Sequence, residues 1–258
     1  MDVSVITTTY NGLPFLSEAI QSVLDQVFAD FEYIIVDDGS TDATAEVVAD
    51  VRDPRLRYIK RERMGRAAAL NLALQEAKCR YVANLDADDC MLPERLAQQK
   101  AFLDVNSDVG MVGSAYYLRR PDGSETVMTL PLTDADLRQH LFVGYPFVHS
   151  AVMYRREALV MAGGFNESLS CSIDYDACVR VAQRARLTNL PEPLVVRRVH
   201  QRNYFVRNIS LGQYVSASSR IKWRYWKNSG RPLSVLPRLL ASAALGGARK
   251  WIQGQGLC

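Results

Sequence analysis

Residues 81–89 read YVANLDADD, an apolar run followed at once by three carboxylates. Asp86, Asp88 and Asp89 repel one another at neutral pH, and such close like charges cost free energy unless a cation or a shared proton lies between them. We therefore expect a positive group to bind here. A solvated acidic turn that caps a helix beginning near Pro93 is the other interpretation, and this stretch alone leaves both open.

The surrounding sequence alternates between strand and helix patterns. β-Branched and apolar runs predict strands at 3–9, 33–36, 56–59 and 81–85, and apolar residues at helical spacing predict helices at 14–26, 41–51 and 66–77. This order is typical of an α/β fold with a mostly parallel sheet flanked by helices, in which ligands bind beyond the carboxyl ends of the strands. The three carboxylates follow such an end.

A second acidic turn follows the strand expected at 33–36. In IIVDDGSTD, Asp37 and Asp38 end the strand. Gly39 permits a tight turn, and the polar residues 40–42 can cap the next helix. At the end of the first strand, TTTYNG (7–12) supplies hydroxyls and an aromatic ring suited to a base and a ribose. Each turn is also consistent with a plain strand-to-helix loop, but together the three strand ends predict one polar crevice.

The chain lacks the common phosphate-binding loops. Neither GxxxxGK[ST] nor GxGxxG occurs, so neither a P-loop nucleotidase nor an ordinary dinucleotide enzyme is supported. The phosphates of a ligand would need another positive partner. Carboxylate oxygens suit Mg²⁺ or Mn²⁺, and these ions share their coordination shell with substrate phosphates. The DADD turn therefore predicts a divalent metal site.

Composition indicates an ordinary globular protein. Its 258 residues are 48% hydrophobic and 23% charged, which suits one large domain with or without an appended segment. Five cysteines without a CxxC pair indicate neither a disulfide framework nor a structural zinc site. The N-terminus lacks signal-peptide features and no apolar run approaches roughly 18 residues, so we expect a cytoplasmic protein that spans no membrane.

Charge is distributed unevenly along the chain. Residues 1–192 hold 19 of the 31 basic and all 28 acidic residues, a net charge of −9, whereas the remainder holds twelve Lys or Arg, no acid and all three tryptophans. Basic and aromatic side chains favour an anionic bilayer surface. We expect peripheral membrane association through 202–251, or packing of this segment against the acidic body or in a homodimer. No nucleic-acid-binding module accompanies the charge, and we expect no nucleic-acid partner.

Several segments together carry a family resemblance. In chain order they are ITTTYNG (6–12), IIVDDGSTD (34–42), GRAAALN (65–71), NLDADD (84–89), GGFNE (163–167), DYD (174–176) and RVH (198–200). This set, which extends from Val3 to about His200, resembles the inverting family 2 glycosyltransferases of the GT-A fold. The resemblance implies a GT-A domain over 1–200, with a nucleotide-sugar-binding half at 1–90 and an acceptor-side half at 91–200. The basic, mainly helical segment 201–258 matches no motif.

The resemblance assigns roles to side chains at the strand ends. Asp38 would bind the nucleotide base or ribose, with Thr8 and Tyr10 nearby. Asp86 would face the ribose or the metal shell. Asp88 would contact the metal, Mn²⁺ or Mg²⁺, that bridges the donor diphosphate. The carboxylates would then be tolerated together because the metal and the diphosphate complete the site.

Two neighbouring positions carry less definite roles. Arg66, at the start of an expected helix, would serve the nucleotide phosphates or would simply be solvated. Leu70 stands where the commoner family pattern has an arginine. Asp89 is expected to cap a helix or to support the metal site rather than to bind the ion.

The catalytic base of the family carries over to Asp174. The common pattern is a Glu-Asp pair followed by an aromatic residue and another Asp, and the Asp of the pair is the base. Here Ile173 replaces the glutamate, while Asp174 remains and Asp176 follows. Such a base accepts the proton of the acceptor hydroxyl during its attack on the sugar. Asp174 could also cap a helix expected to run to Arg186.

Other segments would complete the acceptor side. GGFNE (163–167) would form the turn at which donor and acceptor meet, or a plain helix C-cap. His200 matches a family histidine near the metal and the diphosphate, with Arg198 beside it. His149 lies where the family lines the acceptor cleft.

The implied reaction moves a sugar from a nucleotide-diphosphate donor, a UDP-sugar first, to a hydroxyl of a saccharide or polyprenyl-linked saccharide in cell-surface polysaccharide or glycan synthesis. Such a protein would act in the cytoplasm, at the inner face of the membrane. Two alternatives stay open. Leu70 and Ile173 depart from the family pattern, which fits a sugar-nucleotide-binding protein with little turnover. An Asp-x-Asp after an apolar strand also occurs in aspartyl-phosphate phosphatases, although there it normally ends the first strand.

Overall fold

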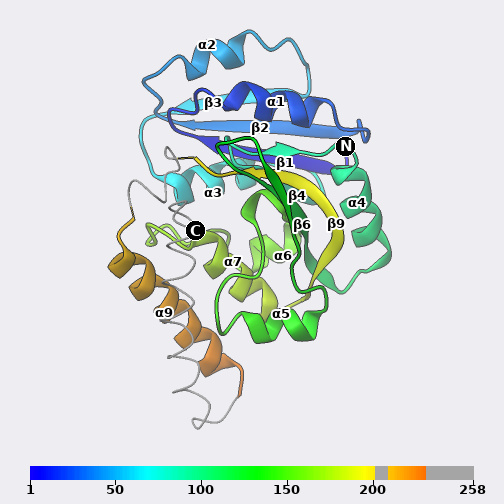
Figure 1. Cartoon of the computed structure of the whole chain (residues 1–258), viewed down its shortest axis with the longest axis vertical. Helices are drawn as coiled ribbons and strands as arrows, with labels where there is room; N and C mark the ends of the chain where they lie inside the picture. The colour runs from blue at the N-terminus through cyan, green and yellow to red at the C-terminus, as the bar shows by residue number, and fades with distance from the viewer. Residues whose placement is uncertain (201–208, 231–258) are drawn as a thin grey trace.

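The computed structural model describes residues 1–200 and 209–230 (Figure 1). The strands are β1 (Val3–Thr9), β2 (Phe31–Asp38), β3 (Leu56–Arg61), β4 (Tyr81–Asn84), β5 (Cys90–Met91), β6 (Val109–Arg119), β7 (Glu125–Met128), β8 (Met153–Arg155) and β9 (Arg186–Arg198). The helices are α1 (Leu16–Leu24), α2 (Thr44–Ala49), α3 (Arg66–Glu76), α4 (Arg95–Val105), α5 (Asp134–His140), α6 (Arg156–Met161), α7 (Ile173–Ala182) and α9 (Leu211–Asn228), with a 3-10 turn, η1 (His149–Ala151), before β8.

The alternation of strands and helices expected over the first 85 residues is confirmed, with local differences at the ends of elements. α2 begins at Thr44 rather than at residue 41. The Asn11 side-chain oxygen accepts the backbone N–H of Thr41 at 2.9 Å, and Asp42 accepts that of Thr44 at 3.1 Å. Residues 41 and 42 are therefore held against the turn after β1, and this turn replaces the first helical turn.

The described strands form one sheet in the order β3-β2-β1-β4-β8-β6-β9-β5, with β7 paired to β6. The strands β3, β2, β1 and β4 are parallel, so their carboxyl ends lie at one edge. β8 then runs antiparallel to both β4 and β6, and β9 runs parallel to β6. The expected α/β class and its mostly parallel first half are confirmed.

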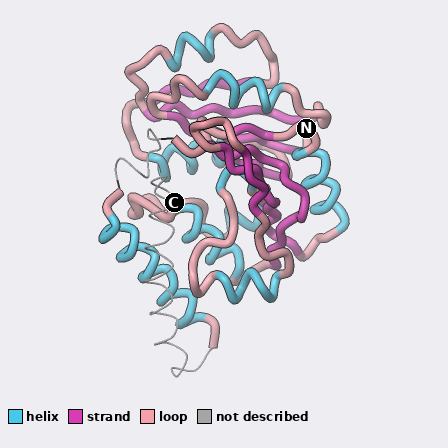
Figure 2. The backbone as a smooth tube through the Cα atoms, viewed as in Figure 1, coloured by secondary structure: helices cyan, strands magenta, loops and turns pink. Residues whose placement is uncertain are grey.

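Helices cover both faces of the sheet, as Figure 2 shows. Side chains alternate along a strand, so neighbours in β1 face opposite ways. Val5 packs into the cluster that contains α1 and α4, whereas Ile6 packs into the cluster that contains α3, α5, α6, α7 and α9. This two-sided burial explains why the strands read as continuous apolar runs in the sequence.

Helix α9 packs against the body of the protein. Ile221, Tyr225 and Trp226 join the larger core cluster, and the ring of Tyr225 lies 4.7 Å from that of Phe142. Trp223 stacks on Trp226 but is 47% exposed. Tyr225 and Trp226 of the basic segment are thus buried against the body, which is one of the arrangements expected for this segment.

The other expectations for this segment rest partly on residues 202–208 and 231–251, which lie outside the described residues. Within the described ranges, no helix combines the length and the apolar character that crossing a bilayer requires. The four cysteines of these ranges, Cys79, Cys90, Cys171 and Cys178, are buried and unpaired.

Candidate active site

Three carboxylates gather just beyond the carboxyl end of β4. Each of Asp86, Asp88 and Asp89 offers an oxygen, and these oxygens lie within 4.8 Å of one another. Burial raises the pKa of Asp89 well above its ordinary value, and the charges of Asp88 and Asp86 raise it further. The expected clustering is therefore present, together with the electrostatic repulsion that it implies.

Asp89 is tied to neighbouring elements of the fold. It is 3% exposed and accepts hydrogen bonds from the Ser150 hydroxyl and, at 2.9 Å, from the backbone N–H of Arg198. The helix-capping interpretation of Asp89 is wrong, because α4 begins at Arg95 with Glu94 at its N-cap. Asp89 instead connects the acidic turn to η1 and to the end of β9.

Asp86 faces a cation from another element. The Arg66 guanidinium donates to Asp86 Oδ1 at 2.6 Å. Burial alone would raise the pKa of Asp86, but the Arg66 charge, together with smaller contributions from His149, Ser150 and Arg197, outweighs it and holds that pKa below its ordinary value. Arg66 opens α3 directly after Gly65, whose φ of +94° is one that glycine adopts readily. Arg66 is thus an ion-pair partner at the site rather than a freely solvated arginine.

Asp88 meets His200, which lies 112 residues further along the chain. The His200 Nε2 is 2.9 Å from Asp88 Oδ2, and the His200 ring packs 4.4 Å from that of Phe15. The structure therefore brings together the two residues assigned to the metal. A carboxylate and an imidazole on adjacent sites are ligand types that a divalent ion accepts.

The expected nucleotide-binding residues lie at the ends of β1 and β2. Asp38 is buried, accepts the backbone N–H groups of Met64 at 2.6 Å and Gly65 at 3.0 Å, and pairs with Arg63 at 3.3 Å. Thr8, on β1, is half-buried. The Asp38 carboxylate therefore also fixes the loop that leads into α3.

Tyr10 carries a partner that the sequence analysis missed. The Arg63 guanidinium lies 3.5 Å from the centre of the Tyr10 ring, which is 44% exposed. Arg63 thus bridges Tyr10 and Asp38. The signal in the sequence was the basic run KRER at 60–63, which ends a strand parallel to β2.

Asp174 lies in the first turn of α7. Its negative charge helps to raise the pKa of Arg66 and, second to burial, that of Tyr214 to about 12. The Asp174 charge therefore acts both on Arg66, beside the acidic turn, and on Tyr214 of α9. The helix does not run to Arg186 as expected. It ends at Ala182, because Arg184 and Ala185 both donate to the Val181 carbonyl and close the last turn.

The two weaker candidates occupy buried positions. His149 is 7% exposed, and its Nδ1 has no hydrogen-bond partner within the described ranges. Burial lowers the pKa of His149, although the charge of Asp86 acts in the opposite direction. Arg198 is 6% exposed, and its guanidinium bonds to Glu18 at 2.5 Å and to the Cys90 sulfur at 2.9 Å. The Arg198 charge is thus compensated within the protein.

The turn formed by GGFNE (163–167) is held by a residue that the sequence analysis did not single out. Asn71 of α3 exchanges two hydrogen bonds of 2.8 Å with the backbone of Phe165 and donates to Glu167 at 2.6 Å. The two glycines also follow α6, where the Gly163 and Gly164 N–H groups bond to its last carbonyls. The segment is therefore both a helix C-cap and a link to α3.

A carboxylate cluster at the carboxyl edge of a parallel sheet, with a further carboxylate, Asp174, in the first turn of a helix, is the arrangement expected of a GT-A glycosyltransferase. Sequence comparison places the chain within that class: it belongs to glycosyl transferase family 2, whose profile matches residues 4–160. An uncharacterized glycosyltransferase of Methanocaldococcus jannaschii is 30% identical over 237 residues, which cover 88% of this chain and 80% of the relative. The chain is therefore a glycosyltransferase, and the phosphatase alternative is wrong.

Two further similarities are to a solved structure and to a longer relative. The structure of residues 1–349 of S. aureus TarS in complex with UDP-GlcNAc superposes with a TM-score of 0.76 at 21% identity, over 99% of this chain and 80% of that one. At this identity the likeness establishes the fold. The chondroitin synthase of Pasteurella multocida is 26% identical over 223 residues, which are 80% of this chain but only 22% of the synthase.

Proposed function

We propose that this glycosyltransferase moves a sugar from a UDP-sugar to a hydroxyl of a saccharide acceptor, with one divalent metal and with inversion at the anomeric carbon. The observation that carries the proposal is the carboxylate cluster at the end of β4, with oxygens within 4.8 Å of one another. Among the described residues, no other group of three or more metal-ligating side chains lies this close together.

The residues present fit a metal at this cluster. Asp88 and His200 would hold Mn²⁺ or Mg²⁺, and Asp86 would complete the shell or bind the ribose. Burial raises the pKa of Asp89, and the charges of Asp88 and Asp86 raise it further; a cation would relieve this second effect. When bound, the ion supplies a positive charge that offsets the charge developing on the leaving diphosphate.

The nucleotide would occupy the ends of β1 and β2. Tyr10 offers a partly exposed aromatic face, while Thr8 and Asp38 offer polar groups beside it. A base that stacks on Tyr10 must displace the Arg63 guanidinium or share the ring with it. Arg66 would help to neutralise the phosphates. A UDP-sugar is the favoured donor because the structurally similar TarS binds UDP-GlcNAc.

Asp174 is proposed as the base. It would accept the proton of the acceptor hydroxyl while that oxygen attacks the anomeric carbon, and the bond to the diphosphate breaks in the same displacement. No covalent intermediate with the protein is needed. His149 feels the charges of both Asp86 and Asp174, and it would line the acceptor cleft. Arg198 would support the diphosphate side through its hydrogen bond to Asp89.

The acceptor is proposed to be a saccharide, or a polyprenyl-linked saccharide, in polysaccharide synthesis, which the similarity to a chondroitin synthase supports.

The catalytic domain would comprise residues 1–200, with its donor half at 1–90 and its acceptor half at 91–200. The segment 201–258 would hold the enzyme at the inner face of the cytoplasmic membrane or in a homodimer. Trp223, exposed on α9, and Lys227 one turn further are the described residues that suit an anionic interface.

The test of the reaction is a transfer assay with labelled UDP-sugars and a panel of oligosaccharides, in Mn²⁺ and in chelator, on wild type and Asp174→Asn. We expect the variant to keep donor binding and to lose about 10²- to 10⁴-fold in transfer, the usual contribution of a general base. The exposed loop change Asp122→Asn is the control. If no donor and acceptor pair supports transfer although the donor binds, the protein is a sugar-nucleotide-binding module. If Asp174→Asn transfers at the wild-type rate, another group is the base.

A further inference from the structure

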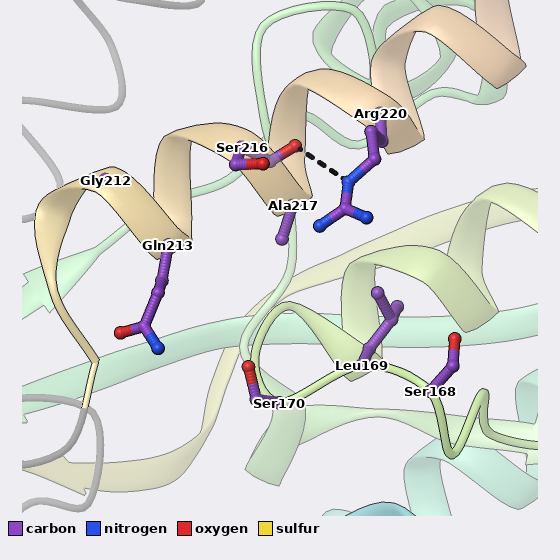
Figure 3. A pocket seen from close by; sticks show the side chains of 8 residues that line it. All are labelled: Ser168, Leu169, Ser170, Gly212, Gln213, Ser216, Ala217 and Arg220. Carbon is purple, nitrogen blue, oxygen red and sulfur yellow. Dashed lines mark hydrogen bonds between the residues drawn. The ribbon is translucent and has the colours of Figure 1, made fainter.

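A cavity of about 290 Å³ lies between α9 and the segment that leads into α7 (Figure 3). The polar residues around it are Ser168 and Ser170 on one side and Gln213, Ser216 and Arg220 on α9. Figure 3 shows Gln213 and Arg220 extending from α9 toward the opposite segment. Its volume is at the lower end of the range for small-molecule sites, about 300–1,000 Å³.

The groups around the cavity suit a sugar. Hydroxyl and amide side chains exchange hydrogen bonds with the hydroxyls of a saccharide, and Leu169 and Ala217 add apolar surface for a ring face. Gly212 leaves space at the N-terminal end of α9, because a Cβ there would meet nothing within 4 Å. The cavity is therefore open to a polar ligand that carries some apolar surface.

Arg220 gives the cavity a positive charge. Its Nε donates to the Ser216 carbonyl at 3.4 Å, and within 1–200 and 209–230 no carboxylate lies close enough to form an ion pair with it. Arg224, one turn further along α9, differs in that it pairs with the buried Asp176. The Arg220 charge is therefore available to an anionic group on a ligand.

The cavity lies next to the proposed base. Ser170 precedes Asp174 by four residues, a reach of at most about 14 Å for a fully extended chain. Tyr214 of α9 feels the Asp174 charge, which contributes to its raised pKa of about 12. Ser172, between Ser170 and Asp174, holds a left-handed backbone with φ of +56°, which turns the chain from the cavity into α7. An acceptor that reaches Asp174 could thus extend into the cavity.

We propose that this cavity is an acceptor subsite for an anionic saccharide, a sugar unit that carries a carboxylate or a phosphate, with Arg220 pairing the anion. The inference rests on the proposed function and names the chemistry of its acceptor. Residues 1–192 carry a net charge of −9, whereas α9 carries four basic residues and no acid, so an anionic acceptor would approach most readily on the α9 side. A neutral sugar would accept hydrogen bonds from Arg220 but would gain no ion pair.

The test measures binding of three probes by saturation-transfer NMR, with and without UDP and Mn²⁺: glucuronate, glucose 1-phosphate and neutral methyl glucoside. The variants are Arg220→Gln, the cavity-filling Gly212→Phe and, as a matched control, Arg184→Gln. Arg184 is exposed on the surface and has no acidic partner within the described ranges. All three sites are exposed, so each variant is expected to fold.

We expect at least one anionic probe to bind more tightly than methyl glucoside. Arg220→Gln should weaken the binding of this probe about tenfold or more, because a charge-assisted hydrogen bond is lost. Gly212→Phe should abolish the binding, and Arg184→Gln should leave it unchanged. Which probe binds identifies the anion. Equal binding of all three probes, or no effect of Arg220→Gln, would overturn the inference. UDP binding is measured in the same samples, so a failure of the donor site is seen separately from a failure of the cavity.

Discussion

The carboxylates after β4, of which Asp86 and Asp88 are part-exposed, and the buried carboxylate of Asp176 in α7 differ in how their charges are compensated. After β4, three acids crowd within 4.8 Å of one another, and Arg66 pairs with only one of them. Asp176 is 1% exposed and bonds two arginines, Arg224 and, at 2.8 Å, Arg180. The first group has an excess of negative charge, and the second has none.

This contrast separates a binding site from a structural pair. Arg180 also donates to the carbonyls of Ala162 and Gly164, so Asp176 ties α7 to the glycine turn through one arginine and to α9 through the other. Such a closed network needs no ligand. The acids after β4 lack this closure, and a cation is the simplest partner that would supply it.

The largest effect is expected from removing charge at the unbalanced cluster. Asp88→Asn should reduce transfer by at least about 10³-fold, since a misplaced metal withdraws several kcal/mol of charge stabilisation from the transition state. The melting temperature without ligands should stay unchanged or rise, because repulsion of Asp89 is relieved. Steady-state turnover and thermal unfolding measure both. A variant that transfers normally but unfolds early would reverse the roles assigned to the two groups.

At Asp176, whose charge is compensated by two arginines, we expect a loss of stability rather than a loss of activity. Asp176→Asn leaves the part-buried Arg180 and the 42% exposed Arg224 facing a neutral side chain, which should cost about 1–3 kcal/mol of unfolding free energy. Urea unfolding measures this loss, and the rate per folded molecule should change little. Asp108→Asn, which removes an exposed partner of Arg186, is the control and should hardly shift the midpoint. A loss at Asp176 no larger than that of the control would show that the buried pair is not structural.

The smallest effect is expected at His149, which feels the charges of both Asp86 and Asp174. Burial lowers the pKa of His149 below its ordinary value of 6.5 in the folded protein. The unfolded chain therefore binds this proton first, so stability is constant above that value and falls as the pH drops through the folded pKa. Urea unfolding of wild type and His149→Gln at about pH 7.5 and about pH 5.5 should show a smaller loss in the variant. An identical loss in both would mean that His149 does not titrate as its burial implies.

The sequence was most informative where function lies in short strand-end turns. Periodicity predicted the first four strands and the helices between them, because β1, β2 and β4 are buried on both faces and read as continuous apolar runs. The motifs predicted that Asp88 and His200 would meet, although 112 residues separate them. That prediction depended on family resemblance, since no spacing rule links two positions so far apart.

The pairing of polar side chains that lie far apart in the chain could not be predicted from the sequence. The Arg63 position over Tyr10, the Glu18 partner of Arg198 and the two arginines around Asp176 depend on how separate elements pack. The end of α7 was also misjudged, because helical periodicity continues past Ala182 while the chain turns back into the sheet. The cavity beside α9 belongs to the same group of features, since its two walls come from segments about 40 residues apart.

The most direct test of the metal–diphosphate site is calorimetric titration of UDP-, GDP- and dTDP-sugars into wild type and Asp88→Ala, each with Mn²⁺ and with chelator. We predict that one nucleotide class, the UDP-sugars, binds wild type in Mn²⁺, and that either chelator or the substitution weakens this binding by at least about 100-fold, a loss of roughly 2.7 kcal/mol. Binding of equal strength in all four conditions would contradict the account, because the carboxylates after β4 would then hold neither a metal nor the donor diphosphate.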